Sequence, residues 1–509
     1  MFKNHPKGLL GAALSNMGER FGFYIMMAIL VLFLSAKFGL SATKASLIYS
    51  IFYFCIYAFA FIGGIISDRT RNYKGTILVG LTLMAIGYLL IAIPTGTPVP
   101  ADKFVFYLLI TCVGLLTIAF GNGLFKGNLQ AVVGQMYDNE KYRHRRDSGF
   151  QWFYMFINVG AVLSPIAGVG IRNWWVTKHG FEYNSDLPRL CHEYLANGVN
   201  MQGFENFQSI AAASGQGSLS IAEFTNQYLN VFNTGFHYAF AIAIGAMLIS
   251  MAIYLTNRKG FPDPAKKEKA VGVQAGEMGI AEIRQRLYAL FAVFAVVIFF
   301  WFSFHQNGVT LTLFARDYTD LSGININLGF TTIKGAEIFQ SINPLFVILL
   351  TPLIVALFSW LRTKGIDPST PKKIAFGMLL AALGFVIMTL GSTHLPTFNE
   401  VQSMGSLPNA MRVTPWLLIG TYFVLTVAEL FISPLGISFV SKVAPPKMQG
   451  MMQGLWLSAT AIGNLPLVLG AIFYENIPIW MTWMIFVGVC LMSMTIMLVM
   501  LKWLEKVAK

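Results

Sequence analysis

The chain is poor in charged residues. Lys, Arg, Asp and Glu make up 12% of its 509 residues, whereas soluble globular domains carry roughly 25%. Hydrophobic residues make up 55% and aromatic residues 14%, and the mean hydropathy is +0.61. Because so little charge cannot cover the surface of a soluble domain, the composition indicates a protein that crosses a membrane several times.

Cysteine and the common catalytic motifs are also scarce. The four Cys residues have no spacing typical of a disulfide framework or a metal site. The patterns H-E-x-x-H, G-x-S-x-G and the P-loop are absent from the sequence. We therefore expect no enzyme activity, no cofactor and no bound metal.

Long apolar segments are what the sequence has instead. A helix needs about 20 mostly apolar residues to span the hydrocarbon core, and about twelve segments meet that requirement. Several of them are longer, so those helices must tilt, bend or project from the membrane. The first segment is too long for a cleavable signal peptide and is expected to remain as a span. The segments lie at 8–36, 44–67, 75–93, 104–135, 150–171, 234–256, 285–315, 336–360, 371–391, 412–441, 450–473 and 478–503.

The basic residues cluster in the short loops on one side of the predicted spans. The net charge is +13, but its position follows the positive-inside rule for cytoplasmic loops. Both termini are then cytoplasmic, and nucleic-acid binding is excluded by this distribution. The basic clusters lie at 69–74, 141–146, 257–269, 362–373 and 441–447, and at both termini.

One long polar segment, residues 172–233, is predicted to lie outside the membrane between the fifth and sixth spans. It contains the Gly- and Ser-rich stretch 211–220. We expect a small cap or a partly flexible loop there, with a partner-binding role as the alternative. The segment has no N-x-S/T sequon, which favours a prokaryotic origin.

Titratable residues lie deep in four of the predicted spans. They are Glu19, Arg20, Lys126 and Glu429, and His305 is a fifth titratable group. A charge at the bilayer centre costs roughly 2.5–3.5 kcal/mol on insertion scales. One such pair could be a buried salt bridge that only joins helices, but five groups over four spans favour a substrate or ion path.

The polar residues in the spans share helix faces. Asn16, Glu19 and Arg20 recur at helical spacing with Phe23, Tyr24 and Met27, which gives one face that begins charged and ends aromatic. Shorter polar faces appear in both halves of the chain. Together they predict a central site between two helix bundles. Their members include Tyr154 and Asn158, Trp301 and His305, Asn343, and Trp456 with Asn464.

Six motifs, spread in order from the first to the eleventh span, resemble those of one transporter family. The family is the proton-coupled oligopeptide transporter (POT) family, a branch of the major facilitator superfamily. The resemblance implies two six-helix bundles around a central cavity, working by alternating access. The motifs are GERFGFY (18–24), GNGLFKGN (121–128), RRDSGFQWFYMFINVG (145–160), FQSINPLF (339–346), AELFISPLGIS (428–438) and MMQGLWLSATAIGN (451–464).

The fold expected from this resemblance is an all-α integral membrane protein of major facilitator type with about twelve spans. Residues 1–257 would form the N-terminal bundle, including the 172–233 loop, and residues 285–509 the C-terminal bundle. Residues 258–284 would be a cytoplasmic linker, because they hold no apolar run long enough for the extra helix pair of some bacterial relatives.

The resemblance also assigns roles to individual residues. Arg20 and Lys126 match the basic residues that hold the carboxylate of a peptide. The second acid of the pattern E-x-x-E-R-F-x-Y-Y, which is linked to proton movement, is Glu19. The matches around the peptide amine are Asn158, Asn343 and Glu429, and those lining the pocket are Tyr24, Tyr57, Trp301 and Trp456; Tyr154 joins the substrate-binding set from the polar face of the fifth span.

Physical chemistry agrees with these roles. A short peptide has two ends of fixed charge and a variable middle, so a cavity that holds the ends tolerates many side chains. Arg offers a planar bidentate contact to a carboxylate, and Lys offers a point charge. Glu429 supplies the opposite charge in the other half of the chain.

Four positions depart from the family pattern. Asn16 stands where the motif has its first acid, Phe23 replaces the first tyrosine, and Met27 replaces an arginine. His305 replaces the acid of an F-E-Q-like motif in the seventh span. In the family, that arginine and that acid resemble a salt-bridge pair that closes the outer gate. Losing only one member would leave an uncompensated buried charge that costs roughly 3–5 kcal/mol. Because both members are replaced here, no such charge remains.

Two interpretations of the departures remain open. In the first, proton symport persists, with Glu19 as the main carrier beside Arg20 and Lys126, and with His305 as a second titrating group. In the second, coupling is weakened or lost, and the protein is a facilitator or carries an altered substrate. For His305 itself, the alternative to a titrating group is a neutral, hydrogen-bonded histidine of the cavity.

We therefore expect an importer of di- and tripeptides in a bacterial inner membrane, with peptide, protons and the lipid bilayer as its partners. No obligate protein partner is evident from the sequence. The alternatives are a facilitator and a transporter of another amine-bearing solute. A channel is disfavoured because no filter-like segment or repeated pore ring is present.

Overall fold

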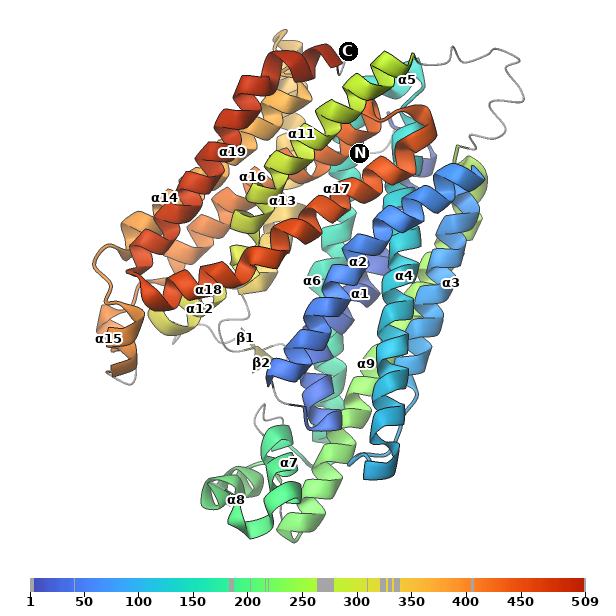
Figure 1. The fold of residues 1–509 in the computed structure, drawn as a ribbon. Helices are drawn as coiled ribbons and strands as arrows, with labels where there is room; N and C mark the ends of the chain where they lie inside the picture. Colours follow the sequence, from blue (N-terminus) through green and yellow to red (C-terminus); the bar gives the residue numbers. More distant parts are fainter. Residues whose placement is uncertain are drawn as a thin grey trace.

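Two groups of long helices make up the structure (Figure 1). They approach each other at the end that holds both chain termini and diverge toward the other end, where α7 and α8 lie. We call these ends the termini side and the α7–α8 side. The computed structural model describes residues 4–40, 42–182, 187–201, 203–215, 217, 219–262, 279–308, 310–320, 326–327, 332–333, 339–403 and 407–507.

The first group contains the long helices of the N-terminal half. They are α1 (Gly8–Phe38), α2 (Ala42–Thr70), α3 (Tyr73–Ala92), α4 (Phe104–Met136), α6 (Arg146–Lys178) and α9 (Ile221–Asn257). Shorter helices connect or cap them. These are η1 (Ala101–Lys103), α5 (Glu140–Arg143), α7 (Leu187–Asn197), η2 (Gly198–Asn200), α8 (Phe204–Ala213) and η3 (Arg258–Gly260).

The second group contains the helices of the C-terminal half. They are α11 (Ile280–Phe304), α12 (Thr310–Tyr318), α13 (Phe339–Thr363), α14 (Thr370–Ser392), α16 (Pro415–Val443), α17 (Gln449–Asn464), α18 (Val468–Asn476) and α19 (Ile479–Val507). The short elements are η4 (His305–Gly308), α15 (Phe398–Ser403), η6 (Asn409–Met411), η7 (Pro446–Met448), η8 (Leu465–Leu467), and the antiparallel strands β1 (Ile326–Asn327) and β2 (Thr332–Ile333).

Membrane crossing is supported by length and composition. Among the described residues, 11 helical segments are long and apolar enough to span a membrane. They correspond to the second through twelfth predicted segments, and the 31-residue helix α1 corresponds to the first. The predicted linker, with the expected absence of an extra helix pair, lies largely outside the described residues.

The seventh predicted span is not one continuous helix. Residues 285–315 were expected to be unbroken, but α11 ends at Phe304 and a 3-10 turn, His305–Gly308, precedes α12. Tyr422 Oη donates to the Asn307 carbonyl at 2.9 Å, so a tertiary contact serves that carbonyl at the break. The break carries His305 to the end of α11.

The eleventh predicted span, residues 450–473, is broken as well. Helix α17 ends at Asn464, the 3-10 turn Leu465–Leu467 follows, and α18 then begins. Pro466 lies in that turn, and its ring has no N–H to donate to the preceding helical turn. The break leaves Asn464 at the end of α17, on the level of the break in the seventh span.

The predicted 172–233 loop is shorter and more ordered than expected. Helix α6 continues to Lys178, and α9 already begins at Ile221. The start of α9 has a capping box, because Ser220 and Glu223 satisfy each other's backbone N–H groups. The boundaries expected from hydropathy were wrong because both helices project beyond the apolar core.

Between these two helices, α7 and α8 form a cap on the N-terminal bundle. His192 on α7 donates from Nε2 to the Ala36 carbonyl at 2.8 Å, and Asn233 on α9 donates to the same carbonyl at 3.1 Å. Tyr194 stacks on Phe204 with ring centroids 6.0 Å apart. Of the two structures expected for this segment, the described residues form the small cap.

Glycines allow the two bundles to touch at the α2–α17 crossing. A Cβ on Gly64 would lie 2.2 Å from the Gly450 carbonyl oxygen, and one on Gly454 would lie 2.4 Å from the Ala60 carbonyl oxygen. Any side chain at either position would push the helices apart. Helices in a bilayer gain little hydrophobic free energy from associating, so close backbone packing at small residues stabilises the crossing instead.

An acidic side chain of α2 closes this crossing on the termini side. The Asp68 carboxylate accepts hydrogen bonds from the backbone N–H of Gly450 at 3.0 Å and of Met451 at 2.7 Å. These groups belong to the first turn of α17, where backbone donors have no partner inside the helix and the helix dipole favours a negative charge.

A second polar contact joins the bundles on the opposite flank, also on the termini side. Asp147 of α6 accepts hydrogen bonds from Lys373 Nζ at 3.1 Å and from Ser438 Oγ at 2.6 Å. Arg146 donates to the Ser441 carbonyl at 3.1 Å. The bundles are thus tied together on both flanks of the termini side.

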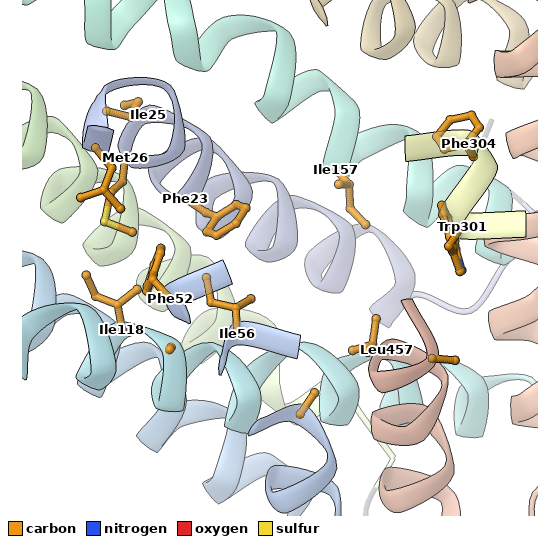
Figure 2. Close-up of a cluster of buried hydrophobic side chains, with 14 of the residues drawn as sticks. Phe23, Ile25, Met26, Phe52, Ile56, Ile118, Ile157, Trp301, Phe304 and Leu457 are labelled. Carbon is orange, nitrogen blue, oxygen red and sulfur yellow. The ribbon is translucent and has the colours of Figure 1, made fainter. Parts of the chain in front are cut away.

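A buried apolar cluster includes side chains of both bundles (Figure 2). Phe23 of α1 points toward Phe52 and Ile56 of α2, and each of these side chains is at most 2% exposed. Ile157 of α6 faces the region of Trp301 on α11 in the same view. Phe23, from the apolar half of the first-span face, is therefore part of the core packing.

Candidate functional site

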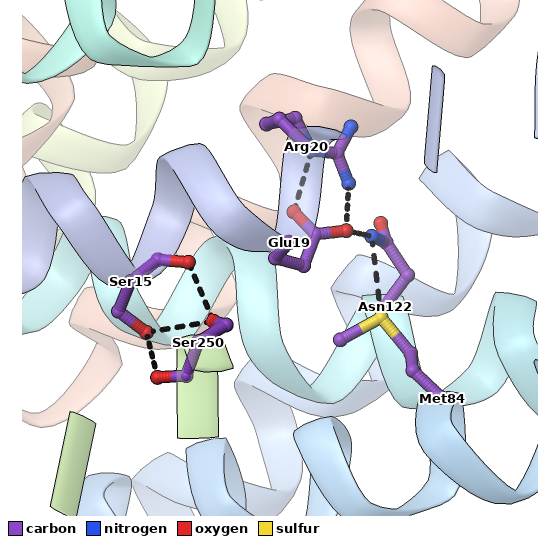
Figure 3. Close-up of polar contacts among 6 residues, drawn as sticks. All are labelled: Ser15, Glu19, Arg20, Met84, Asn122 and Ser250. Carbon is purple, nitrogen blue, oxygen red and sulfur yellow. Dashed lines mark hydrogen bonds and ion pairs between the residues drawn. The ribbon is translucent and has the colours of Figure 1, made fainter. Parts of the chain in front are cut away.

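Glu19 and Arg20 form a fully buried ion pair on α1 (Figure 3). Arg20 Nε and Nη2 each donate to one Glu19 oxygen at 2.5 Å. Asn122 of α4 adds a third donor, with Nδ2 2.6 Å from Glu19 Oε1. The carboxylate is therefore held on both oxygens, and its charge is neutralised within the bundle.

Arg20 still has unused donor capacity. Its Nη1 is buried and has no hydrogen-bond partner among the described residues. The guanidinium carbon lies 4.3 Å from the centroid of the Phe23 ring, which fixes the plane of the group. An unpaired buried donor costs about 1–3 kcal/mol, and a ligand oxygen would remove that cost.

Lys126 of α4 is the second cation of the N-terminal bundle. Its ammonium nitrogen lies 4.4 Å from the centroid of the Tyr57 ring. Within the described part of the chain, it has no carboxylate within salt-bridge distance. Asn122 precedes it by one helical turn, so Glu19, Arg20 and Lys126 belong to neighbouring faces of α1 and α4.

Glu429 lies at mid-depth of α16 and joins both bundles. Tyr154 of α6 donates to Glu429 Oε1 at 2.5 Å, and Asn343 of α13 donates to Oε2 at 2.7 Å. Asn343 also donates to Thr426 Oγ1 at 3.0 Å. The Asn158 amide donates to the Tyr154 carbonyl at 3.1 Å, one turn away on α6. The carboxylate thus has neutral donors rather than a cation.

Trp301 and His305 form a third group at the end of α11. Their rings stack at 4.8 Å with an interplanar angle of 21°. His305 Nδ1 donates to Asn464 Oδ1 at 2.5 Å, which joins the two broken spans. The indole Nε1 of Trp301 is buried and has no partner among the described residues.

The three groups face one another across the bundles. Helix α4, which carries Lys126, packs against α16 and α17 of the other bundle. Tyr154 of α6 and Asn343 of α13 both donate to Glu429 of α16. The predicted site residues from α1, α2, α4, α6, α11, α13 and α16 therefore converge on one region between the bundles.

Trp456 is a predicted site residue with close packing contacts in the C-terminal bundle. It is 2% exposed, and a Cβ on Gly436 would lie 2.1 Å from its ring. Its ring also meets Phe294 edge-on, with centroids 6.1 Å apart. These contacts make Trp456 a packing residue between α16, α17 and α11 in this structure.

Three of the four departures from the family pattern lie in α1. Phe23 is 1% exposed and packs edge-on to Tyr24 at 5.1 Å. Met27 packs against the apolar core. Asn16 is 2% exposed, and its Oδ1 has no hydrogen-bond partner in the described part of the chain. Phe23 and Met27 therefore contribute to packing, whereas Asn16 leaves a polar atom unused.

Asn122 and Thr426 are site residues that the sequence analysis missed. Asn122 lies four residues before Lys126, and Thr426 lies three before Glu429, so the spacing of a helix face could have identified both. The described residues contain no cluster of three or more His, Cys, Asp or Glu side chains that could hold a metal.

The overall fold matches that of solved transporter structures, which defines the class as a helical membrane protein with that fold. One is a peptide transporter POT in complex with sulfate, with TM-score 0.60, 24% identity and coverage of 100% of this chain and 96% of that chain. Another is a POT family transporter in complex with 5-aminolevulinic acid, with TM-score 0.60, 22% identity and coverage of 100% and 98%.

The sequence comparison specifies the family. The POT family matches residues 74–283 and 272–481, so this chain belongs to the POT family. The family and the fold class predicted from the sequence are thereby confirmed.

Curated relatives match along most of their length. The peptide transporter YePEPT of Yersinia enterocolitica is 29% identical over 498 residues, which cover 91% of this chain and 87% of the relative. The di-/tripeptide transporter of Lactococcus lactis subsp. lactis is 27% identical and covers 90% and 87%. Dipeptide and tripeptide permease B of Xenorhabdus bovienii is 25% identical and covers 91% and 86%.

Proposed function

We propose that this protein imports di- and tripeptides by proton symport, through alternating access of one central site. The observation that carries the proposal is the separation of charge. The N-terminal bundle supplies Arg20 Nη1 and the Lys126 ammonium, while Glu429, on the C-terminal bundle, has only neutral donors. A peptide zwitterion would place its carboxylate at the first pair and its amine at Glu429.

The relatives support the choice of substrate. Three of them carry peptide transport in their names. The fixed end charges of a peptide match the two ends of the site, and its variable side chains would lie between them. The peptide amine would replace Tyr154 as the donor to Glu429, or would bind Glu429 beside it. Because this hydrogen bond joins the two bundles, binding would change the contact between them.

The proton step follows from the pairing of Glu19. A substrate carboxylate that binds Arg20 competes directly with Glu19 for the guanidinium. A Glu19 carboxylate that loses this cation becomes easier to protonate, because a buried charge without a partner is costly. Asn122 would then retain the protonated acid in place. Peptide and proton would thereby bind together.

We further propose that the protein lies in a bacterial inner membrane with both termini in the cytoplasm. The hydrogen bonds of Asp68 and Asp147 then close the cytoplasmic end of the path. The structure would correspond to a state that receives substrate from outside the cell. The positive-inside distribution of Lys and Arg supports this orientation.

Uptake of a labelled dipeptide into proteoliposomes tests the function directly. With an acidic exterior, we expect accumulation above the external concentration, and without a gradient we expect only equilibration. A dipeptide with an amidated C-terminus is the control, because it lacks the carboxylate for Arg20 and Lys126. No uptake of either compound under both conditions would refute peptide transport.

A facilitator is the second candidate, and one observation favours it. Glu19 is neutralised by Arg20 and Asn122, while His305 bonds a neutral amide and has no acid partner at 4.0 Å or less in the described part of the chain. Both titratable groups are therefore satisfied without a moving proton. Equal equilibration with and without a pH gradient would support this candidate over symport.

A further inference from the structure

A second polar cavity lies on the termini side, where the flank of α6 meets α13 and α14. Its volume is about 390 Å³, and both bundles line it. We call it the seam pocket. The lining residues that matter for its chemistry are Arg145, Asp147, Gln151, Phe358, Arg362 and Lys373. None of these residues belongs to the central site.

The seam pocket has an excess of positive charge. Arg145, Arg362 and Lys373 line it, and Asp147 is the carboxylate that lines it. Asp147 is already satisfied by Lys373 at 3.1 Å and by Ser438 at 2.6 Å. Arg362 also lies 3.5 Å from Asp367, whose side chain is 59% exposed, so water screens that pair. Arg145 Nε donates to His144 Nε2 at 3.1 Å, so the Nη groups of Arg145 and Arg362, on opposite bundles, are the donors for a ligand.

Two further features indicate an anionic ligand. Gln151 is 1% exposed, and its amide nitrogen has no hydrogen-bond partner among the described residues. Helix α6 begins at Arg146 without a side-chain cap, so its first backbone N–H groups and its helix dipole lie at the rim of the pocket. An unused buried amide donor and an uncapped helix start both favour an oxyanion.

We propose that the seam pocket binds a phosphate-type oxyanion, held by Arg145 from one bundle, Arg362 from the other, and the Gln151 amide. Two sources supply this chemistry: a soluble phosphate compound, and the headgroup of an anionic phospholipid in the adjacent leaflet. Phe358, on the same wall, carries the Lys373 ammonium 4.6 Å above its ring, so the pocket combines an apolar wall with a cationic rim.

Because the seam pocket lies between the two bundles on the termini side, a bound ligand would affect the conformational cycle. An anion that contacts Arg145 and Arg362 together links the two bundles on the side where Asp147 already joins them. It would stabilise the state with the termini side closed and slow the opening of that side. This consequence rests on the proposed alternating access, whereas binding of the anion does not.

Thermal unfolding of the purified full-length protein tests the binding. Inorganic phosphate is added to detergent-solubilised protein, with sodium chloride at equal ionic strength as the reference. In a second arm, the protein is placed in nanodiscs of phosphatidylglycerol or of phosphatidylcholine. We expect a higher unfolding midpoint with phosphate, with phosphatidylglycerol, or with both, because a ligand of the folded state stabilises it.

Variants of the pocket make the test specific. The double variant Arg145→Gln with Arg362→Gln should weaken binding at least tenfold, since each charged hydrogen bond contributes about that factor. Gln151→Leu keeps the volume, removes the amide and should also weaken binding. Lys364→Gln removes an exposed charge next to the pocket and is the matched control.

Each outcome decides the proposal. Stabilisation by phosphate that the pocket variants lose and Lys364→Gln keeps supports a soluble ligand, and the same pattern with phosphatidylglycerol supports a lipid. No stabilisation in either arm would overturn the proposal, as would stabilisation that the pocket variants retain. If the double variant does not fold, Gln151→Leu alone decides. Loss of peptide uptake leaves this binding assay unaffected, so the two proposals fail separately.

Discussion

At the scale of single residues, the central site is organised by which charges already have partners. Glu19 and Arg20 neutralise each other. Lys126 has an aromatic neighbour, and Glu429 has the neutral donors Tyr154 and Asn343. Unpaired charges in a membrane interior are costly and usually functional, so the reactivity of the site is expected at Lys126 and Glu429.

Replacing Lys126 by Ala should reduce uptake of peptides with a free carboxylate by roughly 10- to 100-fold, the factor expected for one charged hydrogen bond. Liposome uptake of a labelled dipeptide measures the effect. Lys126→Arg, which keeps the charge, is the control and should retain part of the activity. Wild-type uptake by Lys126→Ala would mean that the carboxylate binds elsewhere.

Replacing Glu19 by Gln should abolish accumulation driven by a pH gradient and preserve exchange of labelled for unlabelled peptide. Gln can keep the contact with Asn122 but cannot bind a transported proton. Accumulation and counterflow are measured in the same proteoliposome preparation. Glu19→Asp, which retains an acid, is the control. Full accumulation by Glu19→Gln would exclude Glu19 as the carrier.

Replacing His305 by Ala should change the pH dependence of uptake while peptide binding remains measurable. Imidazole is the side chain whose ordinary pKa lies closest to neutral pH, and His305 stacks on Trp301 and bonds Asn464 at the end of α11. His305→Gln retains a donor for Asn464 without a titrating group and separates charge from hydrogen bonding. An unchanged pH profile in both variants would remove His305 from the coupling scheme.

At the scale of elements, the function depends on helices that break or touch at defined points. The breaks after α11 and α17 bring His305 and Asn464 together. The close crossing of α2 and α17 depends on Gly64 and Gly454, where no Cβ fits. Hydropathy predicts the helices but neither of these contacts, because each joins helices that are distant in the sequence. The first joins the ends of α11 and α17, and the second is the crossing of α2 and α17.

Gly454→Val tests the crossing of α2 and α17. Its Cβ would lie 2.4 Å from the Ala60 carbonyl oxygen, so the termini side should not close fully and uptake should fall at least severalfold. In a cysteine-free background, a cysteine at Ser438 should then react faster with a maleimide. Gly488→Val, where a Cβ meets no atom within 4 Å, is the control. Unchanged labelling and uptake would contradict the packing argument.

At the scale of the whole molecule, a contact outside the membrane spans couples stability to pH. His5 Nδ1 lies 2.7 Å from Tyr137 Oη, which joins the start of the chain to the end of α4. Burial, together with the nearby positive charge of Arg145, lowers the pKa of His5 from 6.5 to about 4. The folded protein therefore keeps this imidazole neutral.

Stability should fall as the pH drops from about 6.5 toward 4. In that window the unfolded chain binds a proton at His5 and the folded chain does not, so the free energy of unfolding decreases by at most about 1.4 kcal/mol per pH unit. Unfolding midpoints at pH 7.5 and 5 measure this. His5→Asn should reduce the pH dependence, and the exposed His394→Asn should not. Equal pH dependence in wild type and His5→Asn would refute the assignment.

The sequence by itself determined the class and the family, and it identified the buried charges from which the candidate site is proposed. Apolar segments of spanning length are read directly from composition, since the bilayer imposes their length. Buried charges such as Glu19, Lys126 and Glu429 are conspicuous because lipid makes them costly. Helical periodicity further separated the charged from the apolar half of the α1 face.

Only the tertiary structure decided which partner each group has. The bond of Asn122 to Glu19, the bond of Tyr154 to Glu429 across the bundles and the packing of Trp456 against Gly436 depend on contacts between distant segments. The seam pocket likewise exists because α6 meets α13 and α14. Spacing along one helix predicts a face but carries no information about which helix that face meets, and packing between helices supplies that choice.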